Sequence, residues 1–226
     1  MKKIMILLFV LICSTTTADA QNYFQLQLGF GFPSGDFADD NYNNAIFKGD
    51  GYASTGFNLG IKYYYPLEVE GLSMVLGVNI FYNPLDADCK DKLEDVWDDV
   101  KFSKYINIPI MFGVNYKISV HEKISFFGEG SLGVNILKIT NLKMENDYYN
   151  TDLEINFHPS FKLSYAIGMG ILFQDKYSLG LHYYGLGSHK CKYEEIFDTT
   201  EKEDKKFDRA LDISILSLTF GIKLGK

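Results

Sequence analysis

Residues 106–116 read INIPIMFGVNY and contain the pattern that decides the fold. Every second residue, from Ile106 to Tyr116, is large and apolar or aromatic. The residues between them are mostly small or polar, and include Asn107, Gly113 and Asn115. Because successive side chains of a β-strand point to opposite faces, this alternation predicts a strand with one apolar face.

The same alternation occurs in eight segments of the chain, and we expect each to cross a bilayer as a tilted strand. The segments are 24–32, 57–65, 76–82, 106–116, 126–136, 163–173, 179–183 and 216–224. A soluble sandwich would bury its large apolar residues against a second sheet. Here the opposite face carries Gly, Ser and Asn, which suit a narrow lumen, while the large residues suit lipid. The pattern predicts an all-β, eight-stranded antiparallel transmembrane up-and-down barrel.

The connections alternate in length. Short links at 66–71, 118–123 and 174–176 alternate with long ones at about 33–51, 83–103, 140–157 and 188–208. All long connections therefore emerge on one side, as in outer-membrane barrels with long external loops and short periplasmic turns. A secreted barrel with an apolar interior is the alternative.

The N-terminus carries an export signal. Lys2 and Lys3 precede the apolar run 4–12, and Ala18-Asp19-Ala20 forms a small-x-small cleavage site. We expect residues 1–20 to be a cleaved Sec signal peptide, because the apolar run is too short to span a bilayer. Residues 21–226 would then form one barrel domain, integral to the outer membrane.

Several segments resemble strands of the small outer-membrane β-barrel domain family that includes PorT-like proteins. The segment 105–116, with its Ile-Pro step, resembles the fourth strand; 126–135 resembles the fifth, and 163–173 with 177–187 the sixth and seventh. The resemblance covers essentially the whole mature chain and implies an outer-membrane location. It does not imply one activity, because one fold serves many functions.

Strand parity places five ionisable side chains inside the predicted lumen: Lys62, Glu129, Lys162, His182 and Lys223. A charge buried in a narrow barrel must be paired or hydrogen-bonded. Glu129 is the acid that falls inward in mid-strand, so the three lysines are its candidate partners. A structural polar core is the main interpretation, and a proton or solute path is the alternative, because eight strands leave just enough room for side chains.

A search for catalytic, cofactor and metal sites finds weak signals. His158 and Ser160 share a strand face, but no carboxylate follows to orient a catalytic base. Asp86-x-Asp88 begins like a calcium loop, but Lys90 stands where a further ligand belongs. We therefore expect no catalytic residues, no cofactor and no metal.

The long connections are acidic, with 22 acidic and 10 basic residues, in a chain of 226 residues and net charge −7. This balance argues against a nucleic-acid partner. In the second long connection, Leu93, Val96, Trp97 and Val100 have the spacing of one helix face within 91–101. We expect this face to pack over the barrel mouth or to contact a partner.

Cys89 and Cys191 fall in two external connections, and two cysteines in an exported chain suggest a disulfide. Spacing alone cannot establish their proximity.

The sequence thus predicts a monomeric, non-enzymatic barrel in membrane lipid. Its acidic external loops would carry a structural or interaction role, with an extracellular or envelope protein as a possible partner. A small-solute channel is the alternative function, and an enzyme that modifies lipid A is a third.

Overall fold

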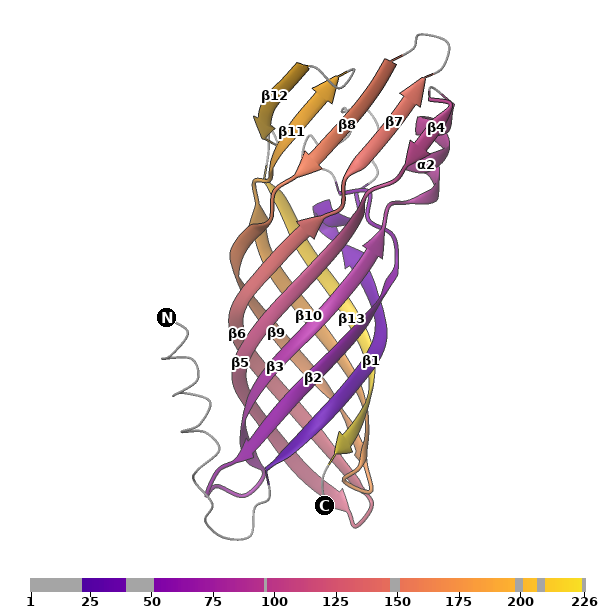
Figure 1. Cartoon of the computed structure of the whole chain (residues 1–226). Coiled ribbons are helices and arrows are strands. Elements are labelled where there is room, and N and C mark those ends of the chain that lie inside the picture. The colour runs from indigo at the N-terminus through magenta and orange to yellow at the C-terminus, as the bar shows by residue number, and fades with distance from the viewer. Residues whose placement is uncertain are drawn as a thin grey trace.

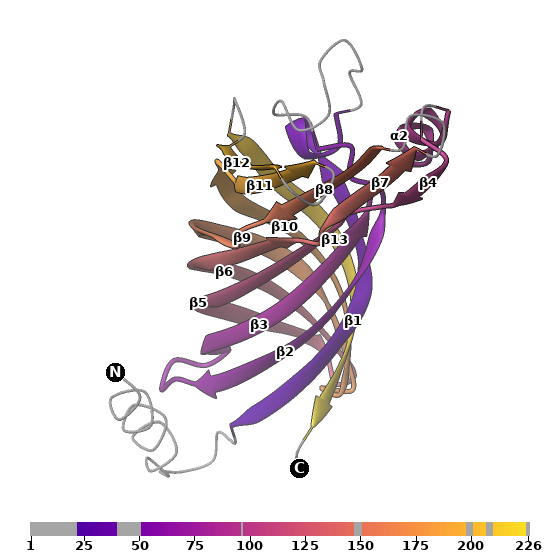
Figure 2. The ribbon, with the colours of Figure 1, turned by 45° about the horizontal axis from the view of Figure 1, so that its top comes forward.

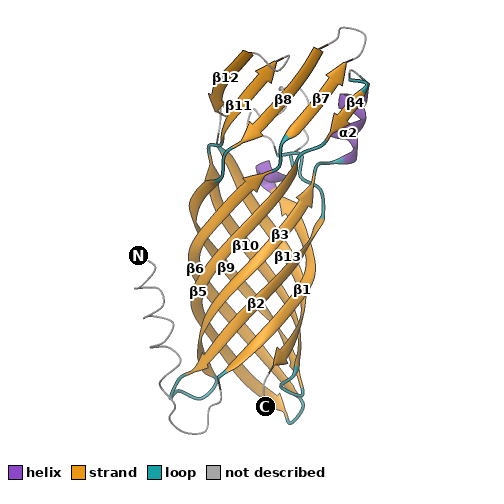
Figure 3. Ribbon diagram, in the orientation of Figure 1, coloured by secondary structure: helices purple, strands orange, loops and turns teal. Residues whose placement is uncertain are grey.

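A computed structural model describes residues 22–39, 51–95, 97–146, 151–197, 201–206 and 210–224. The predicted signal peptide, 1–20, and residue Val96 lie outside these ranges. Strands dominate the described chain, and its two short helices lie near the same end of the barrel (Figure 3). Among the described residues, no helix is long and apolar enough to cross a membrane.

Eight long strands close into one barrel (Figure 1). They are β1 (Tyr23–Ser34), β2 (Gly56–Pro66), β3 (Leu72–Pro84), β5 (Lys104–His121), β6 (Ile124–Ile139), β9 (Ser160–Phe173), β10 (Tyr177–His189) and β13 (Leu211–Leu224). The order around the wall is β1-β13-β10-β9-β6-β5-β3-β2, with every neighbouring pair antiparallel. The predicted eight-stranded antiparallel barrel is confirmed.

The two faces of the wall follow the alternation in the sequence. Apolar side chains of one parity point outward, and Leu132, Leu163 and Met169 are 72%, 83% and 69% exposed. Side chains of the other parity are buried in the lumen, and many are small or polar, such as Asn107 and Ser217. Exposure of this many large apolar residues would be unfavourable in water, so the outer face is the lipid-facing surface.

The long connections, which the sequence predicted as loops, contain regular secondary structure. Five short strands form a second sheet of order β12-β11-β8-β7-β4 beyond one end of the barrel (Figures 1 and 2). They are β4 (Asp99–Lys101), β7 (Leu142–Asn146), β8 (Thr151–Phe157), β11 (Lys192–Phe197) and β12 (Glu201–Lys206). We call this sheet, with α2 (Ala87–Glu94) and the short helix η1 (Gly35–Phe37), the cap.

The predicted helix over 91–101 is wrong in its bounds. The helix α2 begins earlier because the Asp86 side chain caps it by accepting a hydrogen bond from the Asp88 N–H, at 2.9 Å. It ends at Glu94, and the chain then leaves the helix to pair with β7. Leu93 is buried and Trp97 is half-buried, but Val100 lies on β4 rather than on the helix.

We expect a charge on the outer face to destabilise the barrel in a way that depends on lipid contact. Leu132 lies near the middle of β6 and points outward. Leu132→Arg should lower the free energy of unfolding by about 2–4 kcal/mol, because the cation would sit at the depth of the hydrocarbon. Leu132→Val is the matched control and should cost far less. Denaturant titration in phospholipid vesicles measures both, and equal costs would contradict a lipid-facing position.

Candidate functional site in the lumen and the cap

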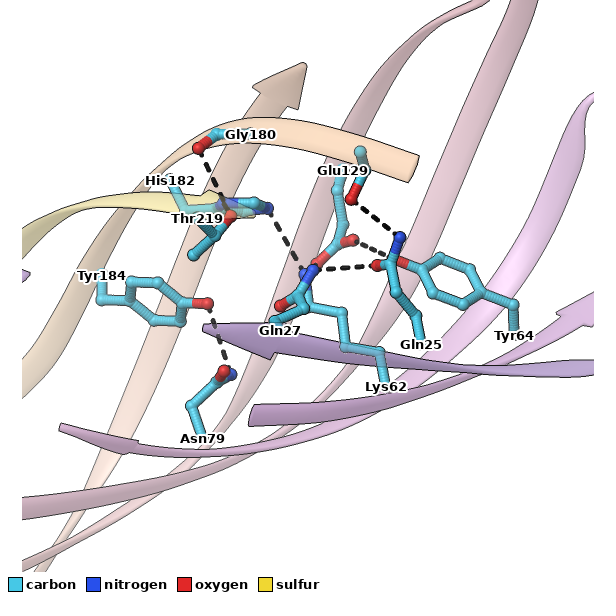
Figure 4. Close-up of polar contacts among 11 residues, drawn as sticks. Gln25, Gln27, Lys62, Tyr64, Asn79, Glu129, Gly180, His182, Tyr184 and Thr219 are labelled. Atoms are coloured by element: carbon cyan, nitrogen blue, oxygen red, sulfur yellow. Dashed lines mark hydrogen bonds and ion pairs between the residues drawn. The ribbon is translucent and has the colours of Figure 1, made fainter. Parts of the chain in front are cut away.

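A buried ion pair lies in the lumen (Figure 4). The ammonium of Lys62, from β2, is 2.6 Å from Glu129 Oε1, from β6, and both side chains are at most 5% exposed. The Lys62 Nζ also lies 3.4 Å from His182 Nε2, on β10. The ion pair spans the lumen, because β2 and β6 are not neighbours in the wall.

Neutral polar groups surround this pair. The Tyr64 hydroxyl lies 3.3 Å from Glu129 Oε2 and 3.2 Å from Gln25 Oε1. Gln25 in turn donates to the Ser178 hydroxyl and accepts from Gln27. These hydrogen bonds reduce the cost of burying the charges. Tyr64, Gln25 and Gln27 were not predicted as site residues, although each has the inward parity that would have found them.

The structure brings together three of the five predicted lumen residues. Lys62, Glu129 and His182 form the cluster described above. Lys162 is exposed near the external end of β9. Lys223 is half-buried at the other end of the barrel, with its ammonium 4.1 Å from the centroid of the Tyr23 ring. The alternation predicted the inward face of these residues correctly but not their depth along the barrel axis. In the structure, Glu129 pairs with Lys62, whereas Lys162 and Lys223 lie towards the two ends of the barrel.

Apolar side chains fill the external end of the lumen. One buried cluster joins inward residues of the barrel, such as Phe81, Tyr105 and Ile215, to residues of the cap. Phe37 of η1 packs edge-on against Tyr105, with ring centroids 5.1 Å apart. Trp97 and Val100 pack on the same cluster, as do the inward residues of β7 and β8: Leu142, Met144, Leu153, Ile155 and Phe157. The cap and the barrel therefore share one core.

The opposite side of the cap is charged. Asp88, Asp91 and Glu94 on α2 are exposed. Asp95, Asp98 and Asp99 follow in the same exposed segment. On the sheet, Lys143 and Glu154 form an ion pair of 2.9 Å between β7 and β8. The described part of the cap thus presents a mainly acidic surface at the α2 corner.

His158 and Ser160 do not act as a pair. His158 is exposed. Ser160 instead contacts His189, with its hydroxyl 3.0 Å from Nδ1, while Nε2 of His189 lies 3.1 Å from the Leu186 carbonyl oxygen. The same Nε2 also lies 3.3 Å from the side-chain nitrogen of Asn135, on β6. This arrangement joins β9 to β10 inside the wall.

Both cysteines are buried and form no disulfide, so the predicted bridge is absent from this structure. Both belong to the core that the cap shares with the barrel. Burial raises the pKa of the Cys191 thiol to about 12. Cys89 and Cys191 thus come from two connections into one cluster, and their oxidation stays a prediction.

Among the described residues, no group of three or more His, Cys, Asp or Glu side chains could hold a metal ion.

Comparisons with known proteins bear on the whole chain. Residues 5–221 match the family described as outer membrane protein beta-barrel domain. Three solved structures share the fold. Neisserial surface protein A is 10% identical, with a TM-score of 0.50, over 92% of this chain and 99% of that chain. A major outer membrane protein from Thermus thermophilus is 13% identical, with a TM-score of 0.55, over 91% and 100%.

The third, outer membrane protein OprG from Pseudomonas aeruginosa, is 14% identical, with a TM-score of 0.50, over 91% and 97%. At these identities the likeness concerns the fold alone. A comparison with curated proteins gives no match.

We expect the buried ion pair to behave as a unit. Lys62→Met leaves the Glu129 carboxylate buried and unpaired, and should cost about 3–5 kcal/mol of stability. The double variant Lys62→Met/Glu129→Gln should cost less than the sum of the single variants, because neither charge is then left alone. Denaturant titrations of the four proteins give the coupling energy.

The matched control is an exposed pair of the same chemistry. Lys117 and Asp175 lie 3.2 Å apart at the other end of the barrel and are 34% and 58% exposed. Lys117→Met should cost at most about 1 kcal/mol. A similar cost for Lys62→Met would show that the lumen pair is not buried in solution.

We expect both thiols to resist alkylation in the folded protein, because burial excludes the reagent and the raised pKa of Cys191 leaves almost no thiolate at neutral pH. Maleimide labelling with mass spectrometry measures this. After unfolding without reductant, two labelled thiols would confirm the free form, whereas none would reveal a disulfide. Fast labelling of the folded protein would show that the cap does not cover them.

Proposed function

The chain belongs to the outer membrane protein β-barrel domain family, and we propose that it uses its barrel as a rigid support for an acidic cap that binds a partner outside the membrane. The barrel is integral to the outer membrane. Binding, and not catalysis or transport, is the proposed role of the cap.

One observation carries this proposal: the core of the cap is continuous with the core of the barrel. Loops that only join strands need no such core, because a closed wall satisfies its backbone without them. Here Leu142, Met144 and Ile155 of the cap are buried together with Phe81 and Ile215 of the barrel. Packing of this kind fixes a surface in one arrangement, which reduces the entropy lost when a partner binds.

The charge distribution indicates the chemistry of the partner. Exposed acids gather on and after α2, while the apolar residues of the cap face inward. Charges at the rim of an interface favour association with a surface of opposite sign and weaken the approach of like charges. We therefore propose a partner with a basic surface, and its affinity should decrease as salt concentration rises.

Solute transport is the weaker alternative. The lumen is filled by apolar side chains at the external end and by a salt-bridged network nearer the other end. Eight strands enclose just enough space for side chains. The filled lumen favours a barrel that supports the cap, and measurement of conductance across planar bilayers tests the channel directly.

We expect charge removal on the cap to abolish binding while the barrel stays intact. The variant Asp88→Asn/Asp91→Asn/Glu94→Gln neutralises three exposed acids of α2. Oligolysine serves as the basic probe, in vesicles of zwitterionic phospholipid that contain the folded protein. Binding measured by calorimetry should be lost in this variant and should weaken with salt in the original protein.

The matched control neutralises three exposed acids at the opposite end of the barrel, Glu68→Gln/Glu70→Gln/Glu122→Gln. This variant should bind oligolysine as the original protein does, because its net charge changes equally but its cap does not. Equal loss in both variants would show a response to net charge alone. Crosslinking on intact cells that express the original or the α2 variant then identifies the natural partner.

A further inference from the structure

The barrel wall has a break in its hydrogen-bond ladder. Pro109 lies inside β5, which is paired on both sides. Its pairing with Asn135 on β6 is continuous. On the other side, the register with β3 is interrupted at Asn79 and Ile80, which stand opposite Pro109 and Ile108. Proline has no N–H, so the backbone carbonyl of Asn79 lacks its usual donor from β5.

Such a break is unfavourable at the depth of the membrane. Hydrocarbon offers no hydrogen bond to an unpaired carbonyl, and irregular backbone is tolerated there only inside protein or beside a water-filled cavity. Proline is also rare in central strands for the same reason. The lumen side of this position therefore needs a compensating group.

A small cavity of about 10 Å³ lies beside the break, which is about the space that one water molecule requires. Gly77 and Asn79 of β3 and Met111 of β5 line it, so it adjoins both strands that lose their pairing. Its polar lining includes Lys62 and Glu129. A water needs two to four polar partners, and this cavity provides them.

The polar groups on the lining have unused hydrogen-bonding capacity. Asn79 is 1% exposed, and its amide nitrogen donates to the Tyr184 hydroxyl at 3.3 Å, but its Oδ1 has no protein partner (Figure 4). If the Asn79 side-chain amide were rotated by 180°, its oxygen would face the Tyr184 hydroxyl and its nitrogen would lack a protein partner instead. The Lys62 ammonium has three donors, and its two contacts described above go to Glu129 and His182.

We propose that this cavity is a binding site for one ordered water molecule. The water accepts a hydrogen bond from the Lys62 ammonium and donates to the unpaired Oδ1 of Asn79, which leans over Gly60 of β2. It adds a polar contact on the lumen side of Asn79, the residue that stands opposite Pro109. The buried ion pair and the β3–β5 seam are then linked through one solvent molecule.

Water-to-protein polarisation transfer in solid-state NMR tests the site in the protein reconstituted in phospholipid bilayers. We expect early transfer from water to the Asn79 side-chain amide. Asn107 is the internal control, because it is equally buried and has an unpartnered nitrogen but does not line the cavity. Equally slow transfer to both residues would show a dry cavity and overturn the proposal.

Gly77→Ala displaces the water without removing a polar group. A methyl at this position would lie 3.2 Å from Lys62 Cγ, close but tolerable beside a flexible side chain. Transfer to Asn79 should fall to the level of Asn107. Gly31→Ala is the matched control, since its methyl would lie 3.1 Å from the Phe81 ring, at a lumen position that does not line the cavity. It should leave the Asn79 signal unchanged.

A second variant keeps the proposal testable if Gly77→Ala does not fold. Asn79→Leu removes the unpaired amide and fills the cavity with an apolar group. Transfer from water to the Lys62 ammonium should then decrease relative to the original protein. Unchanged transfer to Lys62 would show that its hydration does not depend on this cavity and would refute the site.

Discussion

The hydrocarbon of a membrane offers no hydrogen bond to the backbone, and the rest of this structure depends on that constraint. A wall of strands meets it only by closing on itself, because an open sheet would leave two unpaired edges in lipid. The strands β1 and β13 complete the closure through a continuous antiparallel register. Closure at eight strands makes the lumen narrow, which explains why small and polar residues occupy the inner face.

A narrow lumen also decides how its charges are held. Lys62 and Glu129 cannot both be solvated there, so they meet across the lumen and are supported by Tyr64 and His182. A buried pair of this kind contributes little net stability, but loss of one partner is costly. The pair holds β2 and β6 opposite one another across the lumen.

The end of the barrel that carries the cap is not subject to the same constraint. Beyond the membrane, water satisfies the backbone, so short strands with open edges are allowed and form a second sheet. Their apolar residues pack down onto the barrel core. Their charged residues, together with the acids of α2, are left on the outside. The barrel thus determines where the cap sits.

The sequence by itself determined the eight strands and the face of the residues within each predicted segment, because a period of two leaves one choice of inward and outward sides. It placed Lys62, Glu129 and His182 in the lumen for that reason. It did not reveal the register shifts at Gly185/Gly187 and Ser119/His121, where that period is broken. It could not select Lys62 over Lys162 and Lys223, because depth depends on the register around a closed wall. The inward residues of β7 and β8 also alternate, but in runs too short to distinguish from loop.

Only the tertiary structure decided the features that join distant segments. Whether Leu142 and Ile155 join the core that contains Phe81 depends on how β7 and β8 lie above the barrel, and no local pattern encodes this. The same holds for the end of α2, where pairing of β4 with β7 overrides the helical spacing of Val100. Local periodicity fixes which way a side chain points, whereas contacts across the barrel depend on closure, which is a property of all the strands together.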